Sequence, residues 1–473
     1  MPSPNAERMS KVDTAWLRMD SDHNLMMIIG VWTLRPRVSY EALCKRVQER
    51  LLQYDRFRQH VREDATGASW VDHAVDIHEH VVREKLHAKR GTKPQQALQA
   101  RVGELAMQPL DRGRPLWQLH LVEDYDGGSA LIVRIHHCIA DGIALIAVAM
   151  SLVDGGEPPP QRRRKKAPEG PEDWIAETLV KPLADLTSKA LGAAGGSAVK
   201  SLHLLQEPHE AMAGSVEAAR LAWQVMSDAA ALLLMPDDSK TRLKGTPGAQ
   251  KRVAWCPPLP LDEVKAIGKA LNCSVNDVLL SCVAGAIGAY LRSKGDDPAG
   301  QEIRAMVPVN LRPMEHAHKL GNRFGLVPLV LPVGMDNPVE RVYEVRRRMN
   351  ALKGSTQPLL AFLVLAVAGL LVKPAQDAIL NLFGRKTTAV MTNVPGPRDK
   401  LKFLGSTLEH CMFWVPASGE IGLGVSILSY GGGVQFGVIT DTALCPDPQA
   451  IIDAFEPEFA KLSLVTLMLP WGE

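Results

Sequence analysis

"SALIVRIHHCIADGIALIAVAMSLV", residues 129–153, is the stretch of sequence that decides the fold. An apolar run rich in Ile and Val leads into two adjacent histidines, His136 and His137. Such a run, preceded by a Gly-Gly turn, is typical of a buried strand. After Gly142 the chain contains neither Gly nor Pro up to Val153, which predicts a helix. The stretch therefore predicts a strand, a turn that carries the histidines, and a helix.

A second strand is predicted just upstream. The segment "PLWQLHLVEDY", residues 115–125, has strand-like composition and is separated from the first strand by "DGG" at 126–128. A short Asp-Gly connection between two apolar runs favours a β-hairpin. We therefore expect the histidines to lie at the end of a hairpin that packs against the following helix.

Side-chain alternation separates the two histidines. Successive side chains of a strand point to opposite faces, so His137 continues the apolar column of Ile135, whereas His136 lies with Arg134. A histidine on an apolar face suits a general base, because its unperturbed pKa lies near 6.5 and burial favours the neutral form. Of the two, His137 is therefore the better candidate for a base.

Three interpretations of "HHCIADG" compete. In the first, His137 and Asp141 are metal ligands, but no third ligand lies at a usual spacing. In the second, both histidines are structural. In the third, His137 is a catalytic base, Asp141 orders the turn by accepting backbone or Arg hydrogen bonds, and Gly142 provides tight packing or a positive φ angle. Cys138 invites a nucleophile interpretation, although we favour a buried, inert thiol.

Composition limits the class of protein. The chain has 473 residues, of which 46% are hydrophobic and 22% are charged, and its net charge is only +2. This length suits two or three domains with sizeable cores. So small a net charge does not give the protein the positive electrostatic field that would attract nucleic acid. We therefore expect a globular protein that does not bind nucleic acid.

Cysteine usage and the N-terminus indicate the compartment. Seven cysteines are scattered through the chain without a CxxC pair, which argues against a disulfide framework and a thiolate zinc site. The segment "MPSPNAERMSKVDTAW" has no apolar signal core. We expect free thiols and a cytoplasmic location.

The chain divides into three parts. Residues 1–155 and 249–473 each alternate predicted strands and helices, which indicates an α/β fold with two lobes. Residues 156–248 form a Pro-rich, basic linker followed by connecting helices. The basic run at 162–166 could meet anionic lipid or phosphate, but we favour a solvated linker.

One apolar run, Leu359–Val372, is 14 residues long. A membrane-spanning helix needs about 20 residues, so a buried helix is favoured. The small residues Ala361, Ala366, Ala368 and Gly369 would either leave room for an acyl chain or belong to an ordinary core.

Several short elements together resemble a known family. The motif HHxxxDG at 136–142 resembles that of the CoA-dependent acyltransferase superfamily, which includes chloramphenicol acetyltransferase and peptide-synthetase condensation domains. The order and spacing of the other elements are similar to those of bacterial wax ester synthases/diacylglycerol acyltransferases, over about residues 10–460. These elements are PLW (115–117), ND (276–277), VPVNLRP (307–313), GNRFG (321–325) and NVPGP (393–397).

The resemblance implies roles for individual residues. It implies two chloramphenicol acetyltransferase-like lobes with a tunnel between them, His137 as general base, His136 in support, Asp141 as the orienting residue and Gly142 as the motif turn. Asn276 is our candidate donor to the oxyanion, unless Asn276 and Asp277 only cap their helix.

Other residues receive weaker assignments. Thr392 and Asn393 are further candidate donors to the oxyanion. Arg312 and Arg323 would pair either with Asp141 or with CoA phosphates. Trp117 of the PLW element is predicted to serve packing rather than catalysis.

The activity implied by the resemblance is transfer of a long-chain acyl group from acyl-CoA to a fatty alcohol or to diacylglycerol. No cofactor is implied beyond the CoA of the substrate. Contact with a membrane or a lipid inclusion is expected because the substrates are apolar. A condensation-type enzyme that uses a carrier protein, or a non-catalytic lipid-binding protein of this fold, is the alternative. Chain-length preference, the balance between the two acceptors and oligomeric state do not follow from the sequence.

Overall fold

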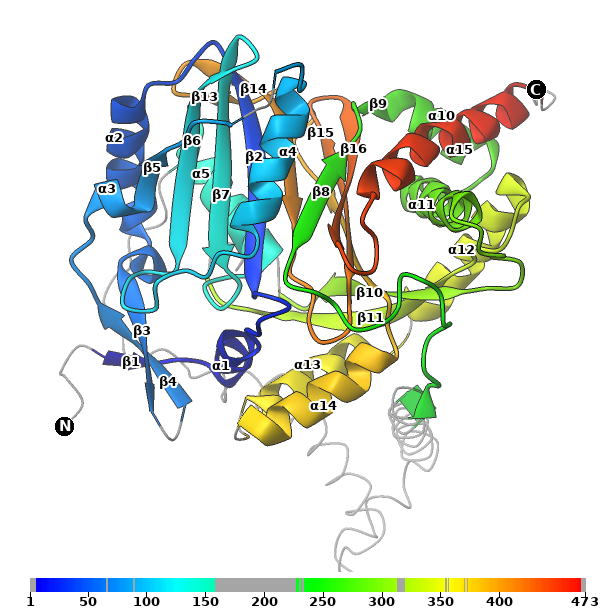
Figure 1. Cartoon of the computed structure of the whole chain (residues 1–473), viewed down its shortest axis with the longest axis horizontal. Coiled ribbons are helices and arrows are strands. Elements are labelled where there is room, and N and C mark those ends of the chain that lie inside the picture. The colour runs from blue at the N-terminus through cyan, green and yellow to red at the C-terminus, as the bar shows by residue number, and fades with distance from the viewer. Residues whose placement is uncertain are drawn as a thin grey trace, which may run out of the picture.

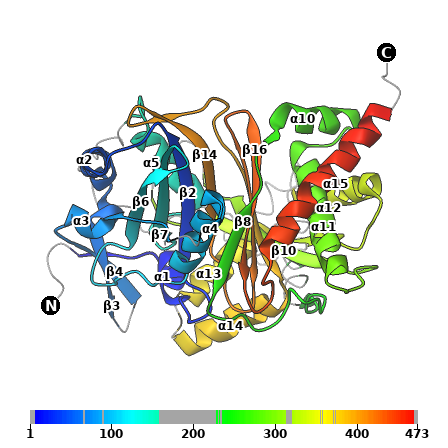
Figure 2. The same ribbon diagram turned by 45° about the horizontal axis from the view of Figure 1, so that its top comes forward.

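Two α/β lobes lie side by side in the structure, a computed structural model (Figure 1). It describes residues 6–468 except 65–66, 88–89, 158–226, 229–230, 232–233, 313–319, 354, 356, 370 and 372. Each lobe is built on a mixed β-sheet covered by helices, and the two sheets lie next to each other at the centre of the molecule (Figure 2). The basic run at 162–166 and most of the linker and connecting helices expected over 156–248 lie outside the described residues.

The first lobe contains a six-stranded sheet in the order β13-β14-β2-β7-β6-β5. Helices α2 and α5 cover one face of this sheet, and α4 covers the other face. A small sheet in the order β1-β4-β3 adjoins it. The bounds of these elements are β1 (Ala6–Arg8), α1 (Lys11–Arg18), β2 (Met27–Arg35), α2 (Tyr40–Arg50), β3 (Gln59–Asp64), β4 (Gly67–Asp72), α3 (Ile77–His80), β5 (Val81–Arg83), α4 (Pro94–Leu105), β6 (Trp117–Tyr125), β7 (Gly128–His136), α5 (Gly142–Leu152), β13 (Lys402–Phe403) and β14 (Ser406–Trp414).

The predicted hairpin and helix are confirmed. Strands β6 and β7 pair antiparallel, with Trp117 opposite Ile135. Asp126 and Gly127 both have positive φ, at 47° and 75°, as a two-residue turn with the right-handed twist of a hairpin requires. The strand alternates as predicted, because Leu131 joins the core on the side of α2 and α5, whereas the neighbouring strand positions face α4.

The second lobe contains a seven-stranded sheet in which β11-β10-β12-β15-β16-β8 follow one another and β9 also pairs with β16. One core lies between this sheet and helices α10, α11, α12 and α15. Ser274 caps α11, and Gly295 follows its end with a φ of 86°. The bounds are β8 (Lys251–Trp255), β9 (Leu259–Pro260), α10 (Leu261–Ala270), α11 (Val275–Ser293), β10 (Ile303–Asn310), β11 (Phe324–Leu331), α12 (Pro338–Lys353), α13 (Gln357–Ala368), α14 (Lys373–Arg385), β12 (Ala389–Pro395), β15 (Leu423–Tyr430), β16 (Gly433–Asp441) and α15 (Pro448–Met468).

Two strands cross the boundary that the sequence suggests. β14 belongs to the range 249–473 but pairs antiparallel with β2, and β13 pairs with β14, so both complete the sheet of the first lobe. The alternating buried positions of β14, which include Leu408, Met412 and Trp414, pack into that lobe. The lobes are therefore joined by these strands and not only by the linker at 156–248.

Helices α13 and α14 lie beside α1 at the junction of the lobes, as both views show (Figure 1 and Figure 2). The apolar run Leu359–Val372 thus supplies the helix that was predicted, and Phe362 and Leu365 of α13 are buried. Among the described residues one helix, α11, is long and apolar enough to cross a membrane, and most of it is buried in the core of the second lobe.

Candidate active site

The site is an apolar cavity of about 310 Å³ between the lobes. This volume lies in the range of small-molecule sites, and so does the predominance of apolar walls. The cavity receives side chains from α1, α5, α13 and α14 and from β10, β11, β12 and β14. Its walls include Trp16, Met306, Phe324, Leu326, Ala361, Leu365, Phe383, Phe413 and Ile421, and its polar members include His137, Asp141, Asn310, Thr392, Asn393 and Ser418.

His137 reaches this cavity because β7 ends at the preceding residue. Its backbone N–H donates to the carbonyl of Met26 at 2.7 Å, which holds the turn against the start of β2. The imidazole is 3% exposed and stacks on Trp16, with ring centroids 4.3 Å apart and planes 20° from parallel. Phe324 contacts the ring from a second direction, with centroids 5.5 Å apart.

The electrostatic surroundings keep His137 neutral. Burial lowers the pKa of His137 to about 3. At neutral pH the imidazole is therefore unprotonated and able to accept a proton. This is the state that a general base needs before the reaction begins.

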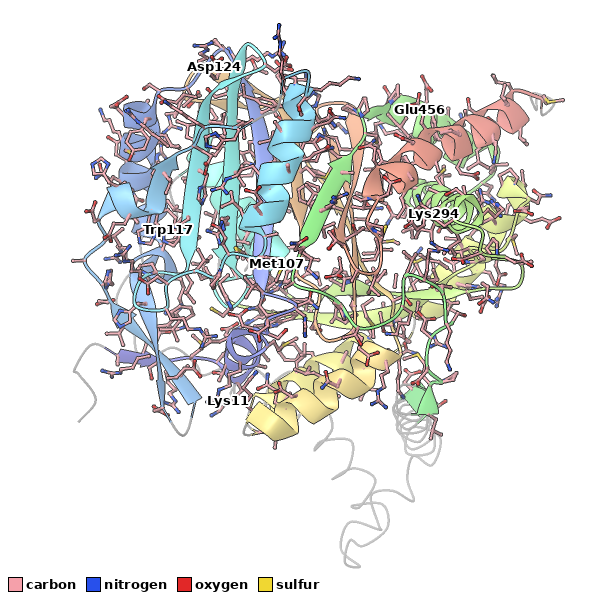
Figure 3. The ribbon with its side chains drawn as sticks, viewed as in Figure 1. Lys11, Met107, Trp117, Asp124, Lys294 and Glu456 are labelled. Atoms are coloured by element: carbon pink, nitrogen blue, oxygen red, sulfur yellow. The ribbon has the colours of Figure 1, made fainter. Side chains whose placement is uncertain are left out.

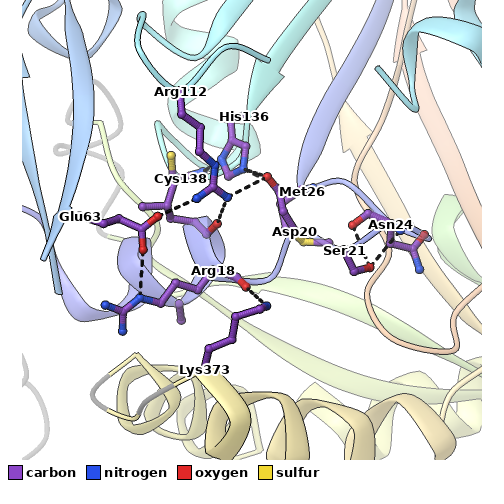
Figure 4. Close-up of polar contacts among 12 residues, drawn as sticks. Arg18, Asp20, Ser21, Asn24, Met26, Glu63, Arg112, His136, Cys138 and Lys373 are labelled. Carbon is purple, nitrogen blue, oxygen red and sulfur yellow. Dashed lines mark hydrogen bonds and ion pairs between the residues drawn. The ribbon is translucent and has the colours of Figure 1, made fainter. Parts of the chain in front are cut away.

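His136 points into different surroundings, as the alternation argument predicts. Its Nδ1 accepts from the backbone N–H of Cys138 at 3.1 Å, so its proton lies on Nε2, which is 3.3 Å from the Asp20 carboxylate. Burial alone would raise the pKa of Asp20, but its partners His136, the backbone N–H of Met26 and Arg112 together lower it. Arg112 continues the network from Asp20 to Glu63 (Figure 4).

Asp141 orders the turn, as predicted. Its Oδ1 accepts from the backbone N–H of Ala144 at 3.0 Å and so caps α5. Its Oδ2 accepts from Arg312 Nη2 at 2.7 Å and from the backbone N–H of Arg323 at 3.0 Å. Of the two partners that the sequence left open for Arg312, the structure shows Asp141.

The prediction for Gly142 is wrong in its physical reason. Gly142 is the first residue of α5 and lines the cavity, yet its φ is not positive and a Cβ atom there would meet nothing within 4 Å. Its lack of a side chain instead leaves space at the wall of the cavity. Helical φ at this position explains the difference, because Asp141 already provides the cap and the turn.

Asn276 does not line the cavity. It is exposed near the start of α11, and its Oδ1 accepts from Asn393 Nδ2 at 2.9 Å. Asp277, by contrast, forms a capping box with Ser274, which confirms the capping alternative for Asp277. Thr392 and Asn393 do line the cavity, so these are the candidate oxyanion donors that the structure brings there. A donor role for Asn276 stays a prediction.

Two residues of the motif region are structural, as predicted. Cys138 is fully buried, and burial raises the pKa of its thiol well above the usual range, which keeps the thiol protonated. Trp117 is fully buried at the start of β6 in the first lobe (Figure 3). Its Nε1 donates to the carbonyl of Phe57 at 3.0 Å, and its ring stacks on His80.

The small residues of the apolar run serve two purposes. Ala361 lines the cavity, together with Val364 and Leu365. Gly369 instead lies against α1, where a Cβ atom would come within 1.8 Å of the carbonyl oxygen of Lys11. Gly369 therefore makes room for a helix and not for a ligand.

Sequence reasoning missed the residues of α1. Trp16 and Asp13 lie about 120 positions from His137 in the sequence, and no spacing pattern connects them to it. Asn322 could have been found from the sequence, because it lies in the GNRFG element.

All seven cysteines are free, as predicted. Within the described ranges, no three His, Cys, Asp or Glu side chains gather in a way that could hold a metal ion.

Comparison with known proteins agrees with this geometry. The family description "Wax ester synthase/diacylglycerol acyltransferase catalytic domain" matches residues 9–279, and "WS/DGAT C-terminal domain" matches residues 320–463. The "Probable diacyglycerol O-acyltransferase tgs1" of Mycobacterium tuberculosis is 28% identical over 470 residues, covering 97% of this chain and 96% of its own. The "Wax ester synthase/diacylglycerol acyltransferase 5" of Arabidopsis thaliana is 22% identical over 479 residues, covering 93% of this chain and 90% of its own.

Solved structures share the fold. A wax ester synthase/diacylglycerol acyltransferase from Marinobacter aquaeolei VT8 has a TM-score of 0.66 at 19% identity, covering 98% of this chain and 100% of that one. The starter condensation domain of rhizomide synthetase RzmA has a TM-score of 0.58 at 14% identity, covering 98% and 95%. The expected two-lobe acyltransferase fold is thereby confirmed. The chain belongs to the wax ester synthase/diacylglycerol acyltransferase family, and it is an acyltransferase.

Proposed function

We propose that this acyltransferase moves a long-chain acyl group from acyl-CoA to the hydroxyl of a long-chain alcohol or of diacylglycerol, with His137 as general base. The observation that carries the proposal is a neutral, buried histidine in the wall of an apolar cavity. The names of the relatives support the choice of acceptors. Apolar walls favour a hydrocarbon chain over a polar acceptor, because burial of apolar surface contributes about 25 cal/mol per Å².

The reaction follows from these groups. His137 takes the proton of the acceptor hydroxyl while that oxygen attacks the thioester carbonyl, so a C–O bond forms and the carbonyl electrons move to oxygen. The tetrahedral intermediate then collapses and the C–S bond breaks. The sulfur of CoA then takes the proton from His137. The products are the ester and CoA thiol, and no covalent acyl-enzyme is formed.

Asp141 has no part in proton transfer in this mechanism. Both of its oxygens already accept hydrogen bonds, from Ala144, Arg312 and Arg323. Its role is to hold the turn and the start of α5. Cys138 is not a nucleophile in this mechanism either, because its thiol is buried and protonated.

Two further proposals concern the surroundings of the reaction. We propose that CoA takes part only as the carrier of the substrate's acyl group and that no separate cofactor is needed. We also propose that the protein acts in the cytoplasm at the surface of a membrane or lipid inclusion, since its acceptor partitions into lipid. Cosedimentation with phosphatidylglycerol vesicles at low and high salt would test that location, and full recovery in the supernatant at both salts would contradict it.

The experiment for the main proposal measures thiol release from palmitoyl-CoA with hexadecanol, with dioleoylglycerol and with neither. Product chromatography identifies the ester in each case. We expect acceptor-dependent release and a wax ester or triacylglycerol product. If the well-folded protein releases no additional thiol when either acceptor is added, the proposal is contradicted. That result would favour a carrier-protein donor or a non-catalytic lipid-binding role.

A further inference from the structure

Helix α14 contributes both to the wall of the cavity and to the hold on α1. Four of its side chains follow one another at spacings of three, four and three residues, which places them on one face of the helix: Lys373, Gln376, Leu380 and Phe383. Leu380 and Phe383 line the cavity. Lys373 and Gln376, at the start of the same face, reach the end of α1. One helix face therefore joins the cavity wall to the helix that carries Trp16.

The contacts between α14 and α1 are made to backbone carbonyls. Gln376 is fully buried, and its Nε2 donates to the carbonyl of Ala15 at 2.9 Å. Lys373 Nζ donates to the carbonyl of Arg18 at 2.8 Å, as Figure 4 shows. In the opposite direction, Arg18 Nη1 donates at 3.3 Å to the carbonyl of Leu371, which lies between α13 and α14. These three hydrogen bonds fasten the C-terminal turn of α1 to the start of α14.

Helix α1 needs such partners. It has only eight residues, whereas an isolated helix shorter than about 12–15 residues is marginal in water. The last four carbonyls of a helix have no partner within it. In α1 the carbonyls of residues 15–18 accept, in chain order, from Gln376, from the backbone N–H of Met19, from Arg112 and from Lys373. Helix α14 therefore supplies two of these four donors and helps to set where this end of α1 lies.

Trp16 lies within the turn that α14 holds. Its side chain is buried and stacks on the His137 ring, with centroids 4.3 Å apart. The carbonyl that Gln376 holds belongs to the residue just before it, Ala15. A shift of this turn would therefore move the indole relative to the imidazole. A misplacement of about 1 Å can lower a reaction rate about 10²-fold.

We propose that Gln376 and Lys373 are positioning residues, which through α1 hold Trp16 against His137, and that a hydrocarbon chain lying on Leu380 and Phe383 stabilises this arrangement. The inference rests on the proposed function, in which His137 is the base and the substrates carry long chains.

The proposal gives chain length an effect on kcat. Apolar surface that a chain buries against the second half of the α14 face favours the packed position of the whole helix. The first half of that face then holds α1, and the stacked ring of His137 keeps its place. A purely structural Gln376 would affect stability, but neither the position of the ring nor the dependence of kcat on chain length.

The first test reads the stacking by NMR. Protein labelled with ¹³C in its histidine rings gives signals for the ring protons, and His137→Gln identifies those of His137. The face of an indole shifts protons stacked on it upfield, so Trp16→Leu gives the position without stacking. We expect the His137 signals to move toward that position in Gln376→Leu and in Lys373→Met. The side chain of Lys373 is 54% exposed, so its variant provides the answer if Gln376→Leu does not fold.

The second test separates positioning from binding. We expect kcat for palmitoyl-CoA and hexadecanol to fall about 10–100-fold in Gln376→Leu, with little change in KM. Exchange of palmitoyl-CoA for octanoyl-CoA, or of hexadecanol for octanol, shows which chain reaches α14. For that substrate the ratio of kcat with the long chain to kcat with the short chain should exceed one in the wild type. It should fall toward one in the double variant Gln376→Leu/Lys373→Met, or in Lys373→Met if the double variant does not fold.

Arg242→Met is the matched control. Arg242 Nη2 donates at 2.8 Å to the carbonyl of Lys294 at the C-terminal end of α11, so it too is a cationic side chain bound to a carbonyl at a helix end. Neither residue lines the cavity. This control should lose stability but retain the His137 signals, kcat and the effect of chain length.

Three outcomes would overturn the inference. They are His137 signals that stay unchanged in both Gln376→Leu and Lys373→Met, a wild-type kcat that does not depend on either chain length, and a chain-length effect that the variants retain in full. Failure of the proposed function looks different. If folded His137→Gln keeps full activity, the base role is removed, whereas the His137 signals still report whether α14 positions Trp16.

Discussion

The ion pair between Arg312 and Asp141 should contribute strongly to stability. The side chains are 1% and 6% exposed, and Arg312 Nη2 lies 2.7 Å from Asp141 Oδ2. Removal of one partner leaves a buried charge without its counter-ion, which costs about 3–5 kcal/mol. We therefore expect Arg312→Met to lower the free energy of unfolding by about that amount.

A double-mutant cycle isolates the pair from other effects of the substitutions. The singles Arg312→Met and Asp141→Asn are compared with the double variant by urea unfolding, followed by tryptophan fluorescence and circular dichroism. We expect the sum of the two single losses to exceed the loss in the double variant by about 2–3 kcal/mol, since the second substitution removes the stranded charge.

Arg37→Met provides the matched control. Arg37 and Asp124 also form a 2.6 Å ion pair, but their side chains are 60% and 73% exposed. Such a pair contributes about 0–1 kcal/mol. A loss below 1 kcal/mol in Arg312→Met, similar to that of the control, would refute the reasoning, and so would strictly additive single losses.

Three further predictions follow from the same site. In the folded state the pKa of His137 is about 3, below its value of 6.5 when unfolded, so the unfolded state binds more protons below pH 6.5 and stability falls as pH falls. Between pH 7 and pH 5 this lowers the free energy of unfolding of the wild type by about 2 kcal/mol. Urea unfolding of His137→Gln should show a decrease that is smaller by that amount, and the same decrease in variant and wild type would contradict the prediction. Gly369→Ala would place a Cβ atom 1.8 Å from the carbonyl oxygen of Lys11, so we expect a loss of about 1–3 kcal/mol and reduced turnover as α1 moves Trp16 from His137; unchanged melting temperature and turnover would disprove this. Cys138→Ala should retain turnover, and the native thiol should resist alkylation by N-ethylmaleimide, as mass spectrometry of the intact and digested protein can show.

Local features of the fold were predictable from the sequence. The hairpin of β6 and β7 follows from its Asp-Gly turn, and the start of α11 follows from Ser274, because these signals act between residues close in sequence. The separation of His136 from His137 follows from strand alternation alone. The strand β14 was not predictable in this way, since its pairing with β2 joins segments more than 370 residues apart and has no local signature.

The same limit applies to the site. The motif at 136–142 indicated the base and the residue that orders its turn, and both lie where predicted. Trp16, which stacks on His137, comes from a helix that is distant from it in sequence. Asp13 of the same helix accepts from Asn322, which in turn donates to the carbonyl of His137. Asn276 shows the converse case, in which a motif residue does not line the cavity itself but accepts a hydrogen bond from Asn393, which does.

The most direct test of the account measures acceptor-dependent thiol release from palmitoyl-CoA by the wild type and by His137→Gln, with circular dichroism to establish that both are folded. A general base typically contributes about 10²–10⁴-fold. The account predicts that hexadecanol-dependent release falls by at least about 10²-fold in the variant. Release at the wild-type rate by folded His137→Gln would contradict the central claim that His137 takes the proton of the acceptor hydroxyl.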